Sequence, residues 1–302
     1  MPAWPCRHVI ALSTVVRQSP CKVNLLLNIL GKRPDGFHEL ETVMQPVQLF
    51  DRLIVAQSAT GIALSCNVPG LPVDGTNLVH KAAAAFLQAT GISAGVSIEL
   101  EKNIPLAAGL GGGSGNAAHT LLALNELFDC PLGTRGIVEL AATLGSDVPF
   151  FLQSQPALAV GRGEQVQSLP AFPALRGAYL LLIHPGFGIS TAWAYQSLAR
   201  FPAALAGTPG RAQKLITLLQ GSDLAAAGRE FYNSLEVPAL PKYPVLGLYQ
   251  EFLRANGSPA VLMSGSGSTT FAILPGREPA DRLLERFQSR FGPSAWTTVA
   301  AV

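Results

Sequence analysis

Charge of either sign is scarce in this sequence, and neither sign has a clear excess. Lysine and arginine together number 21, aspartate and glutamate number 19, and the formal net charge over 302 residues is only +2. Binding to nucleic acid or to an anionic membrane surface draws on concentrated positive charge. We therefore expect no nucleic-acid partner and no membrane partner.

Long apolar runs are also missing, although 48% of the residues are hydrophobic. Charges or prolines interrupt every run before it reaches the ~20 residues that a membrane-spanning helix needs. The N-terminus lacks a basic region followed by an apolar run and a small-residue cleavage site, so we expect no signal peptide. Residues 1–8 are expected to form a short disordered extension, which is too short and too poor in serine and arginine to favour a transit peptide.

Cysteine is rare, and the few cysteines form no recognisable pattern. The four residues are Cys6, Cys21, Cys66 and Cys130. They are widely spaced and show none of the short spacings that bind metal. Reduced thiols fit this usage best, so we expect a cytoplasmic protein.

The chain is long enough to bury a large core in two domains. In the first half, strands are expected at residues 9–16, 22–30, 38–47, 51–56, 62–66 and 96–101, and helices at 77–90, 116–128 and 133–144. In the second half, strands are expected at 178–184, 260–274 and 296–302, the second of them interrupted by a glycine turn, and helices at 191–199, 211–220, 223–231, 243–255 and 279–291. A hairpin is expected over 157–168. Strands and helices occur in blocks, which predicts the α+β class, with domains over 9–170 and 171–302.

The most informative segment is a glycine-rich loop over residues 105–118. Four glycines fall within the five positions 109–113, between an apolar strand and a predicted amphipathic helix. Glycine lets backbone N–H groups turn toward one point, and a helix N-terminus adds unpaired donors and partial positive charge. A flexible linker would be more polar. The segment therefore predicts a phosphate site, although it matches neither the Walker loop nor the dinucleotide fingerprint.

Ser114 lies at the start of the helix that follows the glycines. Its hydroxyl suits an N-cap, and it equally suits a ligand of phosphate-bound Mg²⁺. The sequence leaves both roles open.

Lys22 and Asn24 alternate with apolar residues in a predicted strand, so both side chains point to one face. A lysine buried in such a strand needs a partner. The alternative is that Lys22 lies on the solvent-exposed face of an edge strand.

Asp147 follows a helix and precedes the apolar segment 148–152. An aspartate here is often a turn residue or helix cap. Together with Lys22 it suggests a catalytic pair, because phosphoryl transfer to an alcohol needs a group that accepts the hydroxyl proton.

Residues 263–270 form a second glycine-rich segment, which predicts either a tight turn between strands or a second contact to phosphate.

Taken together, these segments resemble the GHMP kinases, which include galactokinase, homoserine kinase, mevalonate kinase and phosphomevalonate kinase. Residues 105–114 match their ATP loop, and residues 264–268 look like their C-terminal glycine motif. Residues 20–27, 31–40, 144–150, 161–164 and 233–236 are similar to blocks of the members that act on a cytidine-diphosphate-linked methylerythritol.

The resemblance implies a two-domain α+β kinase with its active site in the cleft between the domains. ATP, with Mg²⁺, would phosphorylate the 2-hydroxyl of this small-molecule substrate in non-mevalonate isoprenoid biosynthesis. Residues 9–170 correspond to the N-terminal ATP-binding domain and 171–302 to the C-terminal domain. The protein is expected to be a monomer or a weak homodimer.

The resemblance also assigns roles to individual residues. Lys22 and Asp147 match the catalytic pair. Asn24, Phe37, His38, Thr191 and Tyr195 match substrate-binding residues, with cytosine held by ring stacking and hydrogen bonds. The ATP-binding residues implied are Pro105, Leu106, Ala107, Ala108, Gly109, Leu110, Gly111, Gly112, Gly113, Ser114 and Gly115, with Ser114 also as the Mg²⁺ ligand.

Two positions depart from the family pattern. Cys21 stands where the family usually has alanine, and Gly115 stands where it usually has serine, which removes one hydroxyl near the phosphates. Two rival functions remain: another GHMP small-molecule kinase of the homoserine or mevalonate type, and a sensor that binds ligand without turnover. Phe37, His38 and Tyr195 argue against the first, and the presence of both Lys22 and Asp147 argues against the second.

Overall fold

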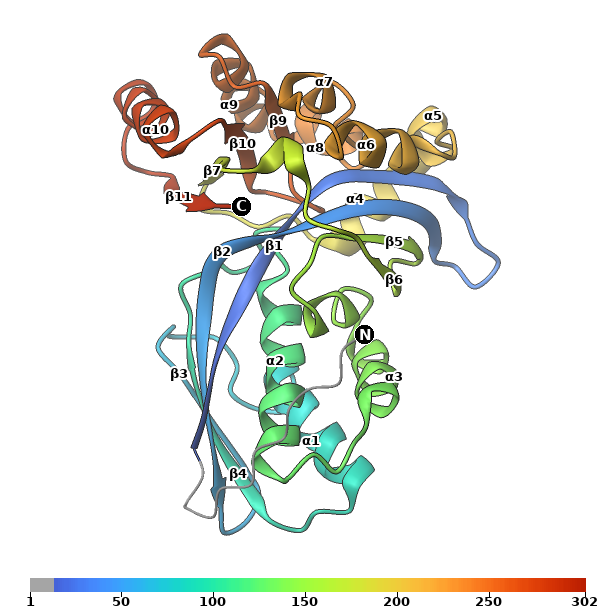
Figure 1. Ribbon diagram of the computed structural model, residues 1–302, viewed down its shortest axis with the longest axis vertical. Helices are drawn as coiled ribbons and strands as arrows, with labels where there is room; N and C mark the ends of the chain where they lie inside the picture. The colour runs from blue at the N-terminus through green and yellow to red at the C-terminus, as the bar shows by residue number, and fades with distance from the viewer. Residues whose placement is uncertain (1–13) are drawn as a thin grey trace. The chain divides into compact units, whose positions relative to one another are not determined.

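The computed structural model describes residues 14–302 of the chain, which divide into two compact units (Figure 1). Unit 1 contains the described residues up to 21 together with 50–104 and 111–154, and unit 2 contains 22–49, 105–110 and 155–302. Both units mix helices and strands, so the predicted α+β class is confirmed. The expectations for residues 1–8, for strand residues 9–13 and for Cys6 lie outside the described residues. The domain boundary near residue 170 stays a prediction.

Unit 1 is a sheet packed against helices. The second part of β2 (His38–Ser58) pairs antiparallel with β4 (Gly95–Glu101), and β4 pairs parallel with β3 (Ile62–Cys66). The helices of this unit are α1 (Leu78–Thr90), α2 (Gly112–Leu127) and α3 (Thr134–Leu144), followed by a short 3₁₀ helix at Pro149–Leu152. The N-cap of α1 is Asn77, whose side chain accepts from the Val79 N–H, and the helix ends at Gly91 in the left-handed region, so its predicted ends are confirmed.

Three predictions in unit 1 are wrong in detail. Strands β1 (Thr14–Lys32) and β2 each run without a break, through residues 17–21 and 48–50, where gaps between separate strands were expected. Helix α2 begins at Gly112 and is buried on nearly every side, so it is neither as short nor as amphipathic as predicted. Its N-cap is Gly111, with φ of 70°, and Ser114 lies inside the first turn, which rules out the N-cap role for Ser114.

Unit 2 contains the first part of β2 and the second part of β1 (Thr14–Lys32). Strand β2 pairs antiparallel with β5 (Ala157–Gly161), and β5 turns back to pair with β6 (Gln165–Ser168), which confirms the predicted hairpin. Strand β1 pairs parallel with the short β8 (Tyr232–Asn233).

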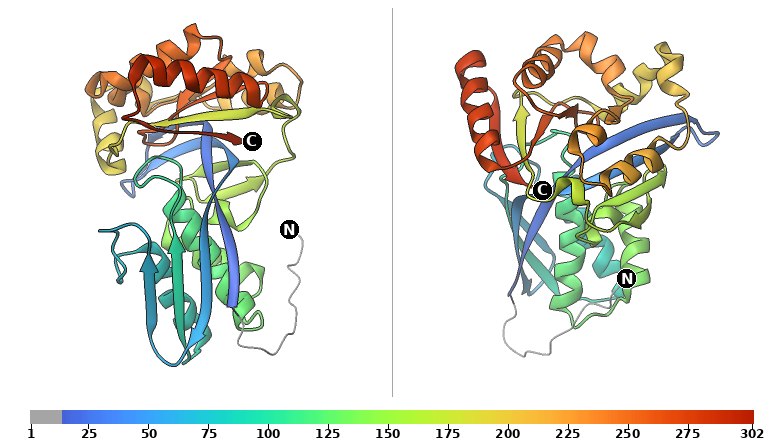
Figure 2. Two further views of the ribbon diagram at one scale, coloured as in Figure 1. Left: turned by 90° about the vertical axis from the view of Figure 1, so that its left-hand side faces the viewer. Right: turned by 45° about the horizontal axis from the view of Figure 1, so that its top comes forward.

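A second sheet in unit 2 is antiparallel, with the order β11-β7-β10-β9. Its strands are β7 (Tyr179–His184), β9 (Ala260–Met263), β10 (Thr270–Leu274) and β11 (Trp296–Ala301). Helices α9 (Pro244–Ala255) and α10 (Arg277–Phe291) pack on one face, where Tyr249, Leu253 and Phe287 bury their side chains against the sheet (Figure 2).

The remaining helices of unit 2 are short. They are α4 (Thr191–Ser197), α5 (Pro202–Leu205), α6 (Arg211–Leu219), α7 (Leu224–Gly228) and α8 (Glu236–Lys242), with 3₁₀ helices at Pro173–Leu175 and Leu198–Arg200. Three of the elements are not predictable from the local sequence: α5 and α8 contain proline, and β8 has only two residues.

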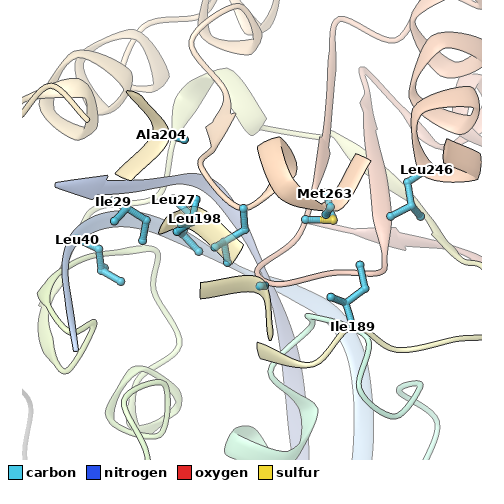
Figure 3. Close-up of a cluster of buried hydrophobic side chains, with 11 residues drawn as sticks. Leu27, Ile29, Leu40, Ile189, Leu198, Ala204, Leu246 and Met263 are labelled. Atoms are coloured by element: carbon cyan, nitrogen blue, oxygen red, sulfur yellow. The ribbon is translucent and has the colours of Figure 1, made fainter. Parts of the chain in front are cut away.

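A core cluster in unit 2 joins strands to these short helices (Figure 3). Leu27 and Ile29 of β1 contribute to it, as do Leu198, Leu246 and Met263 from later in the chain. Met263 is the last residue of β9 and the first of the second glycine-rich segment. The cluster therefore anchors one end of that segment.

Among the described cysteines, Cys21 and Cys66 are not part of a disulfide, whereas Cys130 is disulfide-bonded. The expectation of reduced thiols is therefore wrong for Cys130, since spacing alone does not reveal such a pairing. Within residues 14–302, every helix is too short or too polar to cross a bilayer.

Candidate active site

Lys22 is buried in unit 2, with only 3% of its surface exposed. Its ammonium donates to the Asn24 side-chain oxygen and, at 3.1 Å, to the Gly109 carbonyl. The predicted shared face of Lys22 and Asn24 is therefore confirmed, and the alternative of a solvent-exposed face is wrong. Two acceptors hold the ammonium in place against the start of the glycine loop.

The two glycine-rich segments of the sequence meet at Gly109 and Ser264. The Ser264 hydroxyl donates to the Gly109 carbonyl at 2.9 Å and accepts from the Asn24 N–H at 3.3 Å. Gly109 has a φ of +77°, and a Cβ there would lie 2.1 Å from the Ser264 carbonyl oxygen. Only glycine allows this close approach. The segment 263–270 is thus a tight turn that contacts the loop, as well as a connection between β9 and β10.

Asn233 fixes the shape of this turn. Its side-chain amide, 1% exposed, donates to the carbonyls of Met263 at 2.8 Å and Gly265 at 2.7 Å. The neighbouring carboxylate of Glu236 accepts the Met263 N–H at 2.7 Å, and burial raises the pKa of this carboxyl above its usual value. Residues 233–236 were noticed as a block in the sequence, but their contact with the glycine turn was not.

The predicted base-binding rings lie together in unit 2. The His38 and Tyr195 rings are 5.1 Å apart between centroids, with planes tilted by 41°. Burial lowers the pKa of His38, and the nearby charge of Lys32 lowers it further, so the imidazole is neutral at pH 7. A neutral ring can both donate and accept hydrogen bonds at the edge of a base.

Phe37 is exposed, with 52% of its surface open to solvent. One face of its ring is covered by the Arg162 guanidinium, 4.7 Å from the ring centroid. Thr191, at the first position of α4, lies 3.0 Å from the Ser266 hydroxyl of the glycine turn. Arg162 and Ser266 therefore join the candidate residues, and neither was singled out from the sequence.

Unit 1 carries the rest of the glycine loop. Gly111 is the N-cap of α2 and Gly112 and Gly113 are its first two residues, so the N–H groups of these two are among the unpaired donors at a helix N-terminus. Ser114 is partly exposed in the first turn, which leaves its hydroxyl available to a ligand.

Asp147 is also in unit 1, in the turn between α3 and the 3₁₀ helix that begins at Pro149. The Val148 N–H donates to the Gly145 carbonyl at 3.2 Å and closes this turn. The pairing of Asp147 with Lys22 stays a prediction.

In unit 2, the structure thus brings the buried Lys22 and the second glycine turn to Gly109 of the glycine loop. The sequence pattern of the GHMP kinases N terminal domain matches residues 77–155, and that of GHMP kinases C terminal matches residues 201–293. The chain belongs to the GHMP kinase family and is an ATP-dependent small-molecule kinase.

Particular relatives narrow this class. The chain is 38% identical over 290 residues to the 4-diphosphocytidyl-2-C-methyl-D-erythritol kinase of Geobacter metallireducens, covering 96% of this chain and 98% of the relative. It is 41% identical to the kinase of the same name from Pelotomaculum thermopropionicum, over 88% of this chain and 91% of the relative.

Solved structures agree in fold. A crystal structure of 4-(cytidine 5'-diphospho)-2C-methyl-D-erythritol kinase matches with a TM-score of 0.77 at 34% identity, over 95% of this chain and all of the other. A homoserine kinase from Cytophaga hutchinsonii matches with a TM-score of 0.76 at 20% identity, over 98% and 96% of the two chains. The second likeness concerns the fold alone.

Proposed function

We propose that this kinase transfers the γ-phosphoryl group of ATP to the 2-hydroxyl of 4-(cytidine 5'-diphospho)-2-C-methyl-D-erythritol. The identity to relatives named for this substrate, over nearly their whole length, carries the proposal. The neutral His38 beside the Tyr195 ring supports it, because a base needs an aromatic face and a hydrogen-bonding edge. Homoserine and mevalonate carry no base, so a kinase for either needs no such site for its acceptor substrate.

In the proposed mechanism, Asp147 accepts the proton of the substrate hydroxyl as the oxygen attacks the γ-phosphorus. Lys22 stabilises negative charge at the transferring phosphoryl group, a role that suits a buried ammonium held in place by two acceptors. The backbone N–H groups of residues 109–114 bind the ATP phosphates. Asn24 and Thr191 orient the erythritol part.

Mg²⁺ is the metal that phosphoryl transfer uses to neutralise phosphate charge. The chain offers the Ser114 hydroxyl, an oxygen donor of the kind that Mg²⁺ prefers, in the first turn of α2. We propose Ser114 as a Mg²⁺ ligand alongside the ATP phosphates.

A coupled assay of ADP release tests the proposed substrate. ADP should form when ATP, Mg²⁺ and the cytidylyl methylerythritol are present together. Free homoserine and free mevalonate should give only background. ADP release with either of these, and none with the cytidylyl substrate, contradicts the proposal.

Replacing Asp147 by asparagine tests the proposed base. The shape of the side chain is kept but the proton acceptor is lost, so kcat should fall by roughly 10²–10⁴-fold. The dissociation constant for ATP should stay near that of the wild type. Normal turnover by a folded Asp147→Asn variant refutes the assignment.

A further inference from the structure

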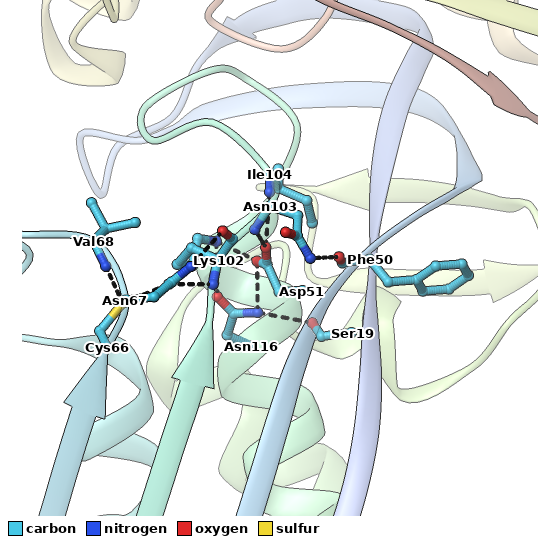
Figure 4. Close-up of polar contacts among 10 residues, drawn as sticks. All are labelled: Ser19, Phe50, Asp51, Cys66, Asn67, Val68, Lys102, Asn103, Ile104 and Asn116. Atoms are coloured by element: carbon cyan, nitrogen blue, oxygen red, sulfur yellow. Dashed lines mark hydrogen bonds and ion pairs between the residues drawn. The ribbon is translucent and has the colours of Figure 1, made fainter.

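A buried ionic cluster in unit 1 has no part in the mechanism above. It consists of Asp51 on β2, Lys102 just after β4, and Asn116 in α2 (Figure 4). Asp51 is fully buried, and the Lys102 side chain is 4% exposed. We call these three residues the Asp51 tether.

The Asp51 carboxylate satisfies donors from both sides of the glycine loop. One oxygen accepts the backbone N–H of Asn103 at 2.7 Å and of Ile104 at 2.9 Å, immediately before Pro105. The other oxygen accepts from the Lys102 ammonium and, at 3.0 Å, from the Asn116 amide, immediately after Gly115. A single carboxylate thus holds the residues that precede the loop and the residue that follows it.

Further bonds hold the segment before the loop, although it has no regular secondary structure. The Lys102 N–H donates to the Asn67 side chain at 2.7 Å, and the Asn67 amide donates back to the Lys102 carbonyl at 3.2 Å. The Asn103 amide donates to the Phe50 carbonyl at 3.0 Å. Strand β4 ends at Glu101, and beyond it hydrogen bonds involving side chains take the place of the backbone hydrogen bonds between strands.

The Lys102 ammonium lies against the first residue of α2. It donates to the Asn116 side-chain oxygen at 3.1 Å, and a Cβ at position 112 would be 3.1 Å from its nitrogen. A cation at a helix N-terminus opposes the helix dipole unless an anion offsets it. Asp51 supplies that anion.

Stability alone is a weak reason for this cluster. Taking two charges out of water is costly, and a well-packed apolar pair of similar volume is often at least as stable. What a buried and fully bonded carboxylate adds is a fixed geometry for the groups that it binds.

We propose that the Asp51 tether is a positioning device for ATP: it sets the spacing and direction of the backbone N–H groups of the glycine loop. The inference rests on the proposed role of residues 105–115 in nucleotide binding. Asp51, Lys102 and Asn116 touch no reacting atom in this scheme. They act through the loop.

The test compares ADP binding by Asp51→Asn and wild type, measured by isothermal titration calorimetry with Mg²⁺ present. We expect the dissociation constant to rise about tenfold, because small displacements of a positioned group cost up to ~10²-fold. The KM for the cytidylyl substrate should stay within about twofold, since its proposed contacts lie in unit 2.

Two variants control for ordinary destabilisation. Arg52 follows Asp51 and Glu101 precedes Lys102, and the two form an exposed ion pair. Arg52→Gln removes this pair and should leave ADP binding unchanged. Val55 is a fully buried core residue of β2, the strand that carries Asp51. Val55→Ala removes part of its side chain but keeps the tether, so it should lower the melting temperature without weakening ADP binding.

The outcomes separate cleanly. A folded Asp51→Asn variant with wild-type ADP affinity overturns the tether, and so does an equal loss of affinity in Val55→Ala. If Asp51→Asn does not fold, Asn116→Ala, which keeps the ion pair, decides by the same measurement. The proposed function is refuted if the wild-type protein binds ADP but does not phosphorylate the cytidylyl substrate. In that case the ADP affinities of the variants still decide whether the tether positions the loop.

Discussion

At the scale of single residues, the candidate site is built from polar side chains that are buried and paired. Lys22, Asn24 and Asn233 are each at most 3% exposed. Lys22 and Asn233 donate to backbone carbonyls of the two glycine segments, and the Asn24 amide donates to the Thr42 hydroxyl. Burial raises the strength of each of these bonds and the cost of losing one partner. We expect substitutions here to disturb geometry well before they change net charge.

The aromatic residue Tyr195 offers a direct test of base recognition. Removing its ring in Tyr195→Ala should raise the KM for the cytidylyl substrate roughly tenfold or more, because base–aromatic stacking contributes ~1–3 kcal/mol. The KM for ATP should not change. Steady-state kinetics on both substrates provide the measurement.

Tyr195→Phe is the matched control, since it keeps the ring that faces His38. Its KM should remain near the wild-type value. A large effect of Tyr195→Phe, or none of Tyr195→Ala, contradicts stacking as the role of this residue.

The alternation of Lys22 and Asn24 was readable from the sequence, because a strand has a period of two. Their burial was not readable, since it depends on Gly109 and Ser264, which are distant in the chain. The contacts of Asn233 and Asp51 were missed for the same reason: nothing local distinguishes a buried, bonded carboxylate or amide from an ordinary surface residue.

At the scale of elements, α2 supports the loop through its burial. Most of its residues are buried, and small ones such as Gly115, Ala117 and Ala118 let neighbouring elements pack closely. His119 is a titratable residue of this helix. Burial lowers its pKa to about 4, with a further contribution from the charge of Arg17.

This shift predicts a pH dependence of stability. The unfolded chain, with a histidine pKa near 6.5, binds a proton more readily than the fold between pH 6.5 and about 4. Stability should therefore fall as the pH is lowered through this window, by roughly 1 kcal/mol between pH 7 and pH 5 after allowance for partial exposure. Urea unfolding at both pH values measures it.

The variant His119→Gln removes the titrating group and keeps a side chain of similar size. Its free energy of unfolding should change less between pH 7 and pH 5 than that of the wild type. An unaltered pH dependence in His119→Gln would show that other groups are responsible.

Most elements with clear periodicity were predicted with nearly correct ends, including α1 with Asn77 and Gly91 as its caps. The start of α2 was placed too late because glycine has low helix propensity. There, burial of Gly112 and Gly115 outweighs propensity. Helix α8 was not predicted because it contains prolines at positions 238 and 241. It places the Glu236 carboxylate where it accepts the Met263 N–H.

At the scale of the whole molecule, each unit is assembled from segments that are distant in the sequence. Strands β1 and β2 contribute to both units, and the predicted ATP loop is divided, with residues 105–110 in one unit and 111–115 in the other. Reading a chain from end to end predicts continuous domains. The sequence does not reveal that one unit contains several separate segments, because the contacts that define a unit form only in the tertiary fold.

The proposed binding of ATP leads to a prediction for the stability of the protein. Bound ATP should stabilise the fold by mass action, by about 2.7 kcal/mol at a concentration 100 times the dissociation constant. Scanning calorimetry should show a higher melting temperature with ATP and Mg²⁺ than without. Chelating Mg²⁺ with EDTA should reduce the shift, and the absence of any shift contradicts nucleotide binding by this loop.

Gly115 lets α2 lie directly against β1. A Cβ at this position would lie 2.8 Å from the Pro20 carbonyl oxygen and 2.9 Å from the Ser19 hydroxyl. Any side chain here therefore requires the backbone of β1 to shift. The close approach of strand and helix behind the glycine loop thus depends on a residue that has no side chain.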